Sequence, residues 1–363
     1  MKITDVQAYL LAIPLKEVDF PAPWVWGAFN QIMVEITTDK GITGYGEAFG
    51  YGVPQGVAAV INHTLRPLLI GSDPRNINSL SERMFRQTHI YGRYGITTFA
   101  ISGVDIALWD LAGKSANLPL YQLLGGRSID TDRVPAYASL VRYNNQNDLK
   151  AAILHARKAG YDMLKLHQLD GESLKTARLA TGNETRLTMD VNCAWNLEEA
   201  IEQARQFAPY RLFWLEEPIY PPEDFRSLAR LSQLSGMPLA SGENACTVFQ
   251  FHEMLEAGAA RFIQPSAIKV GGISEWRKIN SLAEVYNVRI NPHSPYFGPG
   301  LLATAHLIAA SPQADFLEYL YVNLEASVFK DPPRFDRGYL RLPQGPGLGL
   351  EIDPAVLKYY RQV

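Results

Sequence analysis

The segment from Leu187 to Asn244 contains three short apolar runs that each end in an acid: Leu187-Thr188-Met189-Asp190, Phe213-Trp214-Leu215-Glu216 and Leu239-Ala240-Ser241-Gly242-Glu243. The three acids are 26 and 27 residues apart, and a helix-like segment follows each of them. This spacing is typical of successive β/α units in which each acid lies at the carboxyl end of a parallel strand. Because those strand ends share one face of a β/α barrel, we expect the three carboxylates to meet there.

Three carboxylates at one face repel one another strongly unless a cation binds between them. Oxygen ligands with open coordination positions suit Mg²⁺, with Mn²⁺ as a substitute. We therefore predict a metal site formed by Asp190, Glu216 and Glu243. The alternative is three unrelated surface acids that cap helices, which are common at strand-to-helix turns. Their regular spacing and apolar surroundings favour the metal site.

The overall composition restricts the class of protein. A chain of 363 residues fits one barrel of about 250 residues together with roughly a hundred more. The net charge of −3, without a basic block, argues against nucleic acid or an anionic membrane as a partner. No apolar run reaches the ~18 residues of a membrane span, and the first residues alternate like a strand instead of a signal peptide. Cys193 and Cys246 make no disulfide framework, so we expect reduced thiols and a cytoplasmic protein.

Residues 1–125 are expected to form a separate α+β domain. Alternating apolar residues over 31–38 and 42–49, joined by the turn Asp39-Lys40-Gly41, predict a hairpin, with 3–13 as a third strand. Helical patterns follow over 57–70, 77–89 and 97–116.

Two loops of this first domain carry aromatic side chains. The loop 17–29 contains Trp24 and Trp26, and the loop 50–56 contains Tyr51 between glycines. Aromatic residues in such loops often close over a ligand, so we predict that these three bind substrate. The alternative is that the rings dock the loops against their own domain.

Residues 126–320 alternate between strand and helix patterns. Eight strands are expected, which favours a barrel over a doubly wound sheet, and the chain has no dinucleotide or phosphate-loop fingerprint. The tail, 321–363, is rich in Pro and Gly and is expected to pack back on the first domain.

Basic side chains are expected at the same face as the acids. Lys165 and His167 end the second strand two residues apart and therefore point to one side. His293 ends the seventh strand and Glu318 lies on the eighth, while Asn192 follows the first acid. Lysine and histidine groups on opposite sides of a metal suit removal of a proton next to a carboxylate, followed by proton delivery from the other side. Taken alone, His293 and Lys165 would each more often be structural residues, and their joint placement at strand ends that also carry the acids favours a functional role.

Several longer motifs carry a resemblance to a known family. The chain resembles the enolase superfamily, in particular its mandelate racemase and muconate-lactonizing subgroup. The motifs are Ala100 to Lys114, Leu120 to Gly126, Trp214-Leu215-Glu216-Glu217-Pro218, Ser241-Gly242-Glu243-Asn244 and Lys269-Val270-Gly271-Gly272. This resemblance implies an α/β protein with a modified (β/α)₇β TIM barrel and an N-terminal α+β capping domain. It also implies Mg²⁺ on the three acids, enolate chemistry, specificity loops in the first domain, and a homo-oligomer such as a dimer, tetramer or octamer.

The sequence departs from that subgroup at two positions. The second strand ends Lys165-x-His167 where Lys-x-Lys is usual, and Ser266 stands where an aspartate usually partners the histidine of the seventh strand. Without that carboxylate, His293 is a poorer base but still serves as an acid. The departures favour proton abstraction from one side and disfavour racemisation by two bases.

The leading prediction is therefore an acid-sugar dehydratase, a lyase acting on a small carboxylate. Lys165 or His167 removes the proton α to the carboxylate, giving a metal-stabilised enolate, and His293 assists loss of the β-hydroxyl. Glu318 and Asn192 are expected to position the substrate. The same enolate would also serve an epimerase, a racemase or a cycloisomerase of a sugar lactone or cyclic acid. The non-enzymatic alternative is a sugar-acid binding protein that has lost catalysis. The presence of all three predicted metal ligands and of Lys165 argues against it.

Overall fold

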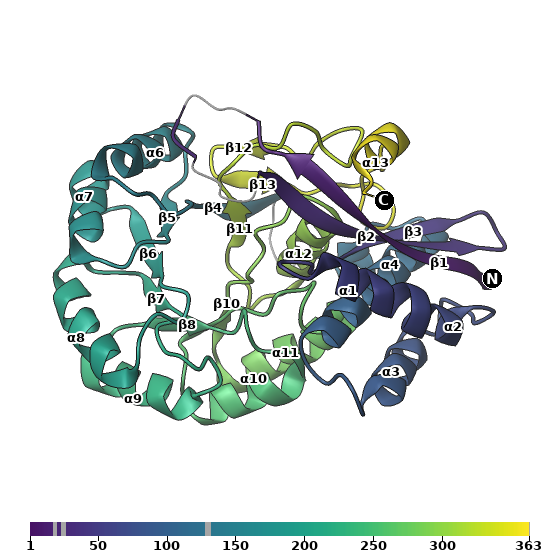
Figure 1. Ribbon diagram of the computed structural model, residues 1–363, viewed down its shortest axis with the longest axis horizontal. Helices are drawn as coiled ribbons and strands as arrows, with labels where there is room; N and C mark the ends of the chain where they lie inside the picture. Colours follow the sequence, from purple (N-terminus) through teal and green to yellow (C-terminus); the bar gives the residue numbers. More distant parts are fainter. Residues whose placement is uncertain (17–19, 23–26, 128–131, 363) are drawn as a thin grey trace.

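The computed structural model describes residues 1–363 except 17–19, 23–26, 128–131 and 363. Figure 1 shows a barrel ringed by helices and, beside it, the domain formed by the first part of the chain. Trp24 and Trp26 lie outside the described residues, so their predicted contact with substrate stays a prediction.

The first domain contains an antiparallel sheet covered by helices. Its strands are β1 (Ile3–Pro14), β2 (Ala28–Thr38) and β3 (Thr43–Ala48), in that order across the sheet. Its helices are α1 (Pro54–Ala59), a π-helical turn η1 (Val60–Leu65), α2 (Arg66–Leu69), α3 (Ile77–Thr88), α4 (Ile96–Ala116) and the short α5 (Leu120–Leu123). The first helix begins at Pro54, three residues before the predicted start, because proline is well suited to a first helical turn.

Helix α4 forms the centre of this domain. By length and composition alone, this helix could cross a membrane. However, 78% of its most apolar stretch is buried inside the protein. Gly46 of β3 packs directly on it, since a Cβ atom there would lie 2.0 Å from the carbonyl oxygen of Gly103. These features are those of a core helix.

The second part of the chain forms the barrel. Among the described residues its parallel strands are β4 (Arg133–Ser139), β5 (Met163–Leu166), β6 (Arg186–Asp190), β7 (Trp214–Glu216), β8 (Leu239–Ser241), β9 (Phe262–Ile263), β10 (Arg289–Ile290) and β11 (Leu317–Leu320). The helices between them are α6 (Gln146–Lys158), α7 (Gly171–Thr181), α8 (Leu197–Phe207), α9 (Phe225–Ser235), α10 (Thr247–Glu256), α11 (Gly272–Tyr286) and α12 (Pro299–Ala310), with a 3₁₀ turn η2 (Ala208–Tyr210) after α8.

The barrel closes through β11. This strand pairs in parallel with β4, and the Asp315 amide donates to the Ile290 carbonyl oxygen at 3.0 Å beside β10. Seven helices lie between eight strands, and no barrel helix follows the last strand among the residues that the structure describes. The predicted modified (β/α)₇β TIM barrel with a capping domain is confirmed.

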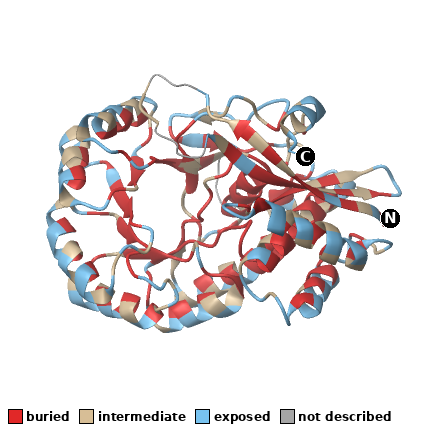
Figure 2. Cartoon of the chain, in the orientation of Figure 1, coloured by how far each residue is buried: buried red, intermediate tan, exposed pale blue. Residues whose placement is uncertain are grey.

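Capping residues near the strand ends fix where several barrel helices begin. Asn196 and Glu199 form a reciprocal capping box at the start of α8, as their spacing predicts. Asp170 and Asp224 likewise accept backbone hydrogen bonds at the starts of α7 and α9. Figure 2 shows that buried residues follow the strands and the inner helix faces, while exposed residues cover the outer helix faces. The acids at the strand ends therefore lie above a packed interior that includes Tyr137, Trp214 and Phe262.

The tail crosses between the two parts of the molecule. It contains β12 (Phe335–Asp336), β13 (Tyr339–Arg341) and α13 (Pro354–Tyr360), and β13 pairs with the first residues of β4. The Gln362 amide donates to the Leu10 carbonyl oxygen at 2.9 Å, so the last residues lie against β1. The division of the chain at residues 125 and 320 stays a prediction.

Side chains of the first domain hold the starts of two barrel helices. On α4, Asp105 accepts from the Ser274 amide at 2.9 Å, and Ser102 accepts from the Gly271 amide at 2.8 Å, both at the start of α11. Glu47 of β3 accepts from the Gly300 amide at 2.9 Å, at the start of α12. The end of β3, which leads into the loop containing Tyr51, is thereby held against the barrel.

Candidate active site

The three predicted metal ligands meet at the carboxyl ends of neighbouring strands. Asp190 ends β6 and Glu216 ends β7, where the two residues are direct partners in the register, and Glu243 follows β8 by two residues. One oxygen from each of the three carboxylates lies within 4.8 Å of the other two. The strand spacing read from the sequence thus places these acids side by side.

Lys165 lies directly beneath these acids and is fully buried. Its Nζ is 2.8 Å from Glu216 Oε1, 3.4 Å from Asp190 Oδ2 and 2.7 Å from Glu318 Oε1. Burial alone would lower the pKa of this lysine, but the surrounding carboxylates outweigh it and hold the pKa well above its usual range. Lys165 is therefore a positive partner of these carboxylates.

His167 faces the same acids from the same strand end. Its Nε2 is 3.3 Å from Asp190 Oδ2, and its Nδ1 is 2.5 Å from the carbonyl oxygen of Leu140. A carbonyl oxygen only accepts, so Nδ1 carries the proton and Nε2 is directed to the acids. Arg142 supports this arrangement, because its Nε donates to the His167 carbonyl oxygen at 2.6 Å.

The pKa values of the acids indicate that their negative charges are not fully balanced by the basic groups nearby. Burial raises the pKa of Glu216 to about 7 and raises that of Glu243 well above its usual range. For Asp190, Lys165 and His167 outweigh burial and lower the pKa. Buried carboxylates that share one lysine are costly, and an oxygen-only donor set suits a hard divalent cation. The residues present therefore fit Mg²⁺.

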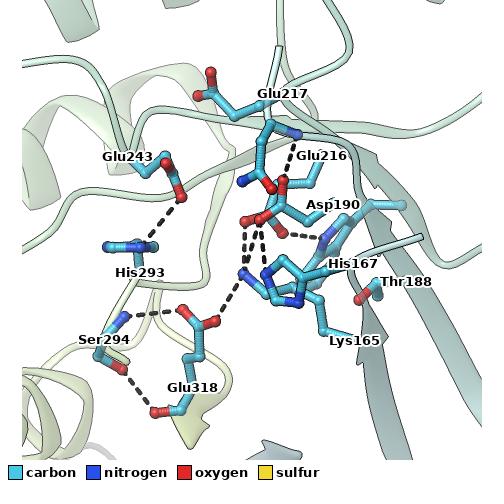
Figure 3. A network of polar contacts seen from close by, with 12 residues as sticks. Lys165, His167, Thr188, Asp190, Glu216, Glu217, Glu243, His293, Ser294 and Glu318 are labelled. Carbon is cyan, nitrogen blue, oxygen red and sulfur yellow. Dashed lines mark hydrogen bonds and ion pairs between the residues drawn. The ribbon is translucent and has the colours of Figure 1, made fainter. Parts of the chain in front are cut away.

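His293 approaches from another side of the acids, as Figure 3 shows. It follows β10, and its Nε2 is 3.2 Å from Glu243 Oε2. Its Nδ1 is 3.1 Å from the hydroxyl oxygen of Tyr296. Burial lowers the pKa of His293 to about 3, so the imidazole is neutral near pH 7.

Other polar groups hold these side chains in place. Trp214 donates from Nε1 to Glu216 Oε2 at 2.9 Å, and the Ser294 amide donates to Glu318 Oε2 at 3.0 Å. Glu217 accepts from Ser241 Oγ and from the Gly242 amide, both at 2.9 Å, next to Glu243. Reasoning from the sequence missed these supporting contacts, because strand spacing says nothing of which side chains bond beneath a site.

A cavity of about 650 Å³ opens above the acids. Of the residues predicted to bind or react with substrate, the described ones that line it are Lys165, His167, Asn192, Tyr51, His293 and Glu318, together with the acids Asp190 and Glu243. Asn192 lies at the cavity wall, where its amide oxygen is 3.5 Å from Nη2 of Arg142. The first domain contributes the rings of Phe29, Phe49 and Tyr51 to the wall.

Lys269 also lies in the cavity wall. It is buried, its Nζ is 4.7 Å from the centre of the Phe49 ring, and the same Nζ is 3.5 Å from the Asn244 amide oxygen. Lys269 therefore contacts both domains.

Comparison with known proteins matches nearly the whole chain. Residues 27–125 match the mandelate racemase/muconate lactonizing enzyme N-terminal domain, and residues 148–356 match the family described as enolase C-terminal domain-like. The chain is 34% identical to arabinonate dehydratase of Saccharolobus solfataricus, over 91% of this chain and 90% of that protein. It is 33% identical to 3,6-anhydro-alpha-L-galactonate cycloisomerase of Streptomyces coelicolor, over 90% of each.

A solved structure shows the same fold. The crystal structure of a racemase from Streptomyces coelicolor A3(2) with bound magnesium is 30% identical and superposes with a TM-score of 0.87, covering 99% of this chain and 100% of that one. The relatives are thus acid-sugar enzymes that include both dehydratases and cycloisomerases.

Proposed function

The chain belongs to the mandelate racemase and muconate lactonizing enzyme subgroup of the enolase superfamily, and we propose that it is a Mg²⁺-dependent hydro-lyase that removes water from a polyhydroxy carboxylic acid. One observation carries this proposal: Lys165 and His293 reach the acidic cluster from different sides, with Nζ beside Glu216 and Nε2 beside Glu243. Groups on two sides suit a reaction in which one proton leaves and another is delivered to a departing oxygen.

The oxygens of Asp190, Glu216 and Glu243 would hold the metal. A Mg²⁺ held there would supply positive charge beside the substrate carboxylate, which favours loss of the α-proton. Asp190 and Glu216, which contact Lys165 Nζ and hold its proton, would then be shared with the metal, so Lys165 would release its proton more readily. Magnesium bound in a relative of the same fold supports this assignment.

Lys165 is the proposed base. It lies at the cavity wall, and Glu318 at 2.7 Å keeps its amine oriented. His167 is the second group on this side, and its Nε2 faces the same acids. Either group takes the α-proton on this side of the substrate, and the variants below distinguish them.

His293 is the proposed acid for the leaving hydroxyl. Burial lowers its pKa to about 3, so the imidazole is neutral before substrate binds. The negative charge of a bound carboxylate substrate favours its protonation, and the low pKa favours release of that proton to the leaving hydroxyl. In the full reaction the α C–H and β C–O bonds break, the base gains one proton and His293 gives one. Water leaves, and the resulting enol rearranges to a 2-keto-3-deoxy acid.

A cycloisomerase is the second candidate, and the aromatic wall of the cavity favours it. Phe29, Phe49 and Tyr51 present ring surfaces to the substrate space, which suit a cyclic substrate. A cyclic acid whose ring oxygen is attached to the β-carbon would open by the same elimination, with the ring oxygen receiving the proton. One of the relatives is a cycloisomerase.

The test is a product and exchange screen in D₂O. The protein is incubated with Mg²⁺ and a library of acid sugars, their lactones and anhydro acids, and products are followed by NMR and mass spectrometry. We expect one member to lose water, and we expect Lys165→Ala and His293→Asn to abolish that loss. The exposed residues Lys158 and His89 offer matched controls, Lys158→Ala and His89→Asn, which should keep the full rate.

The outcomes separate the alternatives. An isomeric ring-opened product that has lost no water would identify the cycloisomerase, and α-deuterium without elimination would identify an epimerase. Full activity in Lys165→Ala with none in His167→Ala would move the base to His167. Tight binding of a library member without exchange or turnover would refute catalysis and favour a binding protein.

We further propose a cytoplasmic, even-numbered homo-oligomer. The free thiols of Cys193 and Cys246 fit a reducing compartment. Light scattering during size-exclusion chromatography measures the oligomer, and a monomer at micromolar concentration would refute this part.

A further inference from the structure

The hydroxyl group of Tyr296 lies among three polar atoms next to His293. Its oxygen is 3.0 Å from the carbonyl oxygen of His293 and 3.1 Å from Nδ1 of the same residue. The third neighbour is Ser266 Oγ, which is in short hydrogen-bond contact with it. Tyr296 and Ser266 are buried, so water does not compete freely for these bonds.

Counting hydrogens fixes the direction of each bond. A phenol has one proton to donate and two lone pairs to accept with. The carbonyl oxygen of His293 only accepts, so the Tyr296 hydroxyl donates there. Its two lone pairs then accept from Ser266 Oγ and from Nδ1 of His293. His293 therefore carries its proton on Nδ1.

We propose that Tyr296, supported by Ser266, is the positioning residue of His293 and holds it in the tautomer with Nδ1 protonated. The role in turnover rests on the function proposed above, whereas the tautomer itself does not. In this tautomer Nε2, which is 3.2 Å from Glu243, is the nitrogen that exchanges protons in the cavity. It does so whether His293 starts neutral or charged, because the second proton always enters and leaves at Nε2.

This arrangement accounts for serine at position 266. The phenol stands between Ser266 and the ring, so residue 266 acts on His293 through Tyr296. A serine can donate its proton to the phenol, whereas a carboxylate there would instead accept the phenol proton and remove it from the His293 carbonyl. The neutral pair also orients the ring without adding a negative charge near Glu243 and Glu318.

His167 shows the same arrangement with a different acceptor. Its Nδ1 is 2.5 Å from the Leu140 carbonyl oxygen, and its Nε2 faces Asp190. In both histidines of the site, Nε2 thus faces the acids, and a neighbouring oxygen binds Nδ1 on the opposite side of the ring. One uses the main chain, and the other uses Tyr296.

Imidazole ¹⁵N NMR of the metal-free protein tests the tautomer directly. The chain has 7 histidines, and the His293→Asn variant identifies the His293 signals. We expect a protonated Nδ1 and an unprotonated Nε2 in the wild type at neutral pH. Tyr296→Phe and Ser266→Ala should shift the population toward a protonated Nε2. The control Tyr161→Phe removes the hydroxyl of another buried tyrosine, which precedes the first residue of β5, whereas Lys165 lies near the last, and should leave the His293 signals unchanged. A wild-type signal with the proton on Nε2 would overturn the inference.

Turnover on the substrate found in the screen gives the second test. Tyr296→Phe should lower kcat for product formation about 10- to 100-fold with little change in KM, as is typical when the partner that orients a histidine is lost. Exchange of the α-proton with D₂O, which depends on the Lys165 side, should continue in that variant. Equal loss of exchange and elimination would mean a general structural role, and no loss of either would refute the positioning role.

The two tests also separate this inference from the proposed function. If the wild type transforms no library member, the proposed reaction fails while the NMR result still decides the tautomer. If the wild type is active, and Tyr296→Phe has the same His293 ¹⁵N signals and the same rate of product formation, the positioning role of Tyr296 is refuted. The proposed reaction would not be affected by that result.

Discussion

The substitution Glu47→Gln tests how burial of a charged group at the interface between the two domains controls stability. Glu47 is buried, lies at the end of β3 and accepts from the Gly300 amide at the start of α12. The space around it is tight, since a Cβ on Gly298 would lie 2.8 Å from Glu47 Oε2. Glutamine has nearly the same shape and keeps an acceptor oxygen, but it does not ionise.

The magnitude follows from the pKa of the carboxyl group. Burial raises the pKa of Glu47 from 4.5 to about 7, against the smaller opposite effect of hydrogen bonds from Gly300 and Gly298. At about 1.4 kcal/mol per pKa unit, this difference corresponds to about 3 kcal/mol. The folded state binds its proton more tightly than the unfolded state, so this contribution is complete below pH 4.5 and is lost as the pH rises through about 7.

The assay is thermal unfolding between pH 5 and pH 9 in EDTA, which removes any effect of metal binding. For a chain of this length, about 3 kcal/mol corresponds to a melting temperature change of about 4 °C. As the pH rises, the melting temperature of the wild type should fall by about 4 °C more than that of Glu47→Gln. Any difference between the two proteins that does not depend on pH is subtracted first. Glu202→Gln, at an exposed position of α8, serves as the control and should follow the wild-type profile. Parallel profiles for wild type and Glu47→Gln would refute the reasoning.

Two further predictions concern the metal and the domain core. Saturating Mg²⁺ at 100 times its dissociation constant should raise the melting temperature by about 3 to 4 °C, and Glu216→Gln should abolish this rise; an unchanged rise in that variant would place the ion elsewhere. Gly46→Ala should destabilise the protein by about 3 kcal/mol or more in calorimetry, because its Cβ would lie 2.0 Å from the Gly103 carbonyl oxygen. The matched change Gly56→Ala, in helix α1 with its nearest neighbour 3.9 Å away, should be neutral or stabilise by up to about 1 kcal/mol, and equal losses for both would contradict the packing argument.

Much of the barrel and of the acidic cluster followed from local patterns. A β/α unit repeats at nearly constant length, and the last residue of each parallel strand lies at one face, so the positions of Asp190, Glu216 and Glu243 in the chain were enough to bring them together. The same logic placed Lys165 and His167 beside them, because residues two apart on a strand point to one side. The capping box at Asn196 and Glu199 was equally local.

The contacts that set the chemistry of each group depend on parts of the chain with no regular spacing between them. Tyr296 and Ser266 are 30 residues apart, and the phenol reaches both Ser266 and His293 only in the folded loop after β10. Glu47 and Gly300 are 253 residues apart and meet only because the first domain docks on the barrel. Periodicity in a sequence specifies which face of an element is apolar, and so it determined the strands, the helices and the face that carries the acids. The direction of a buried side chain, its hydrogen-bond partners and its pKa depend on loop conformation and domain docking, which are properties of the whole packed chain.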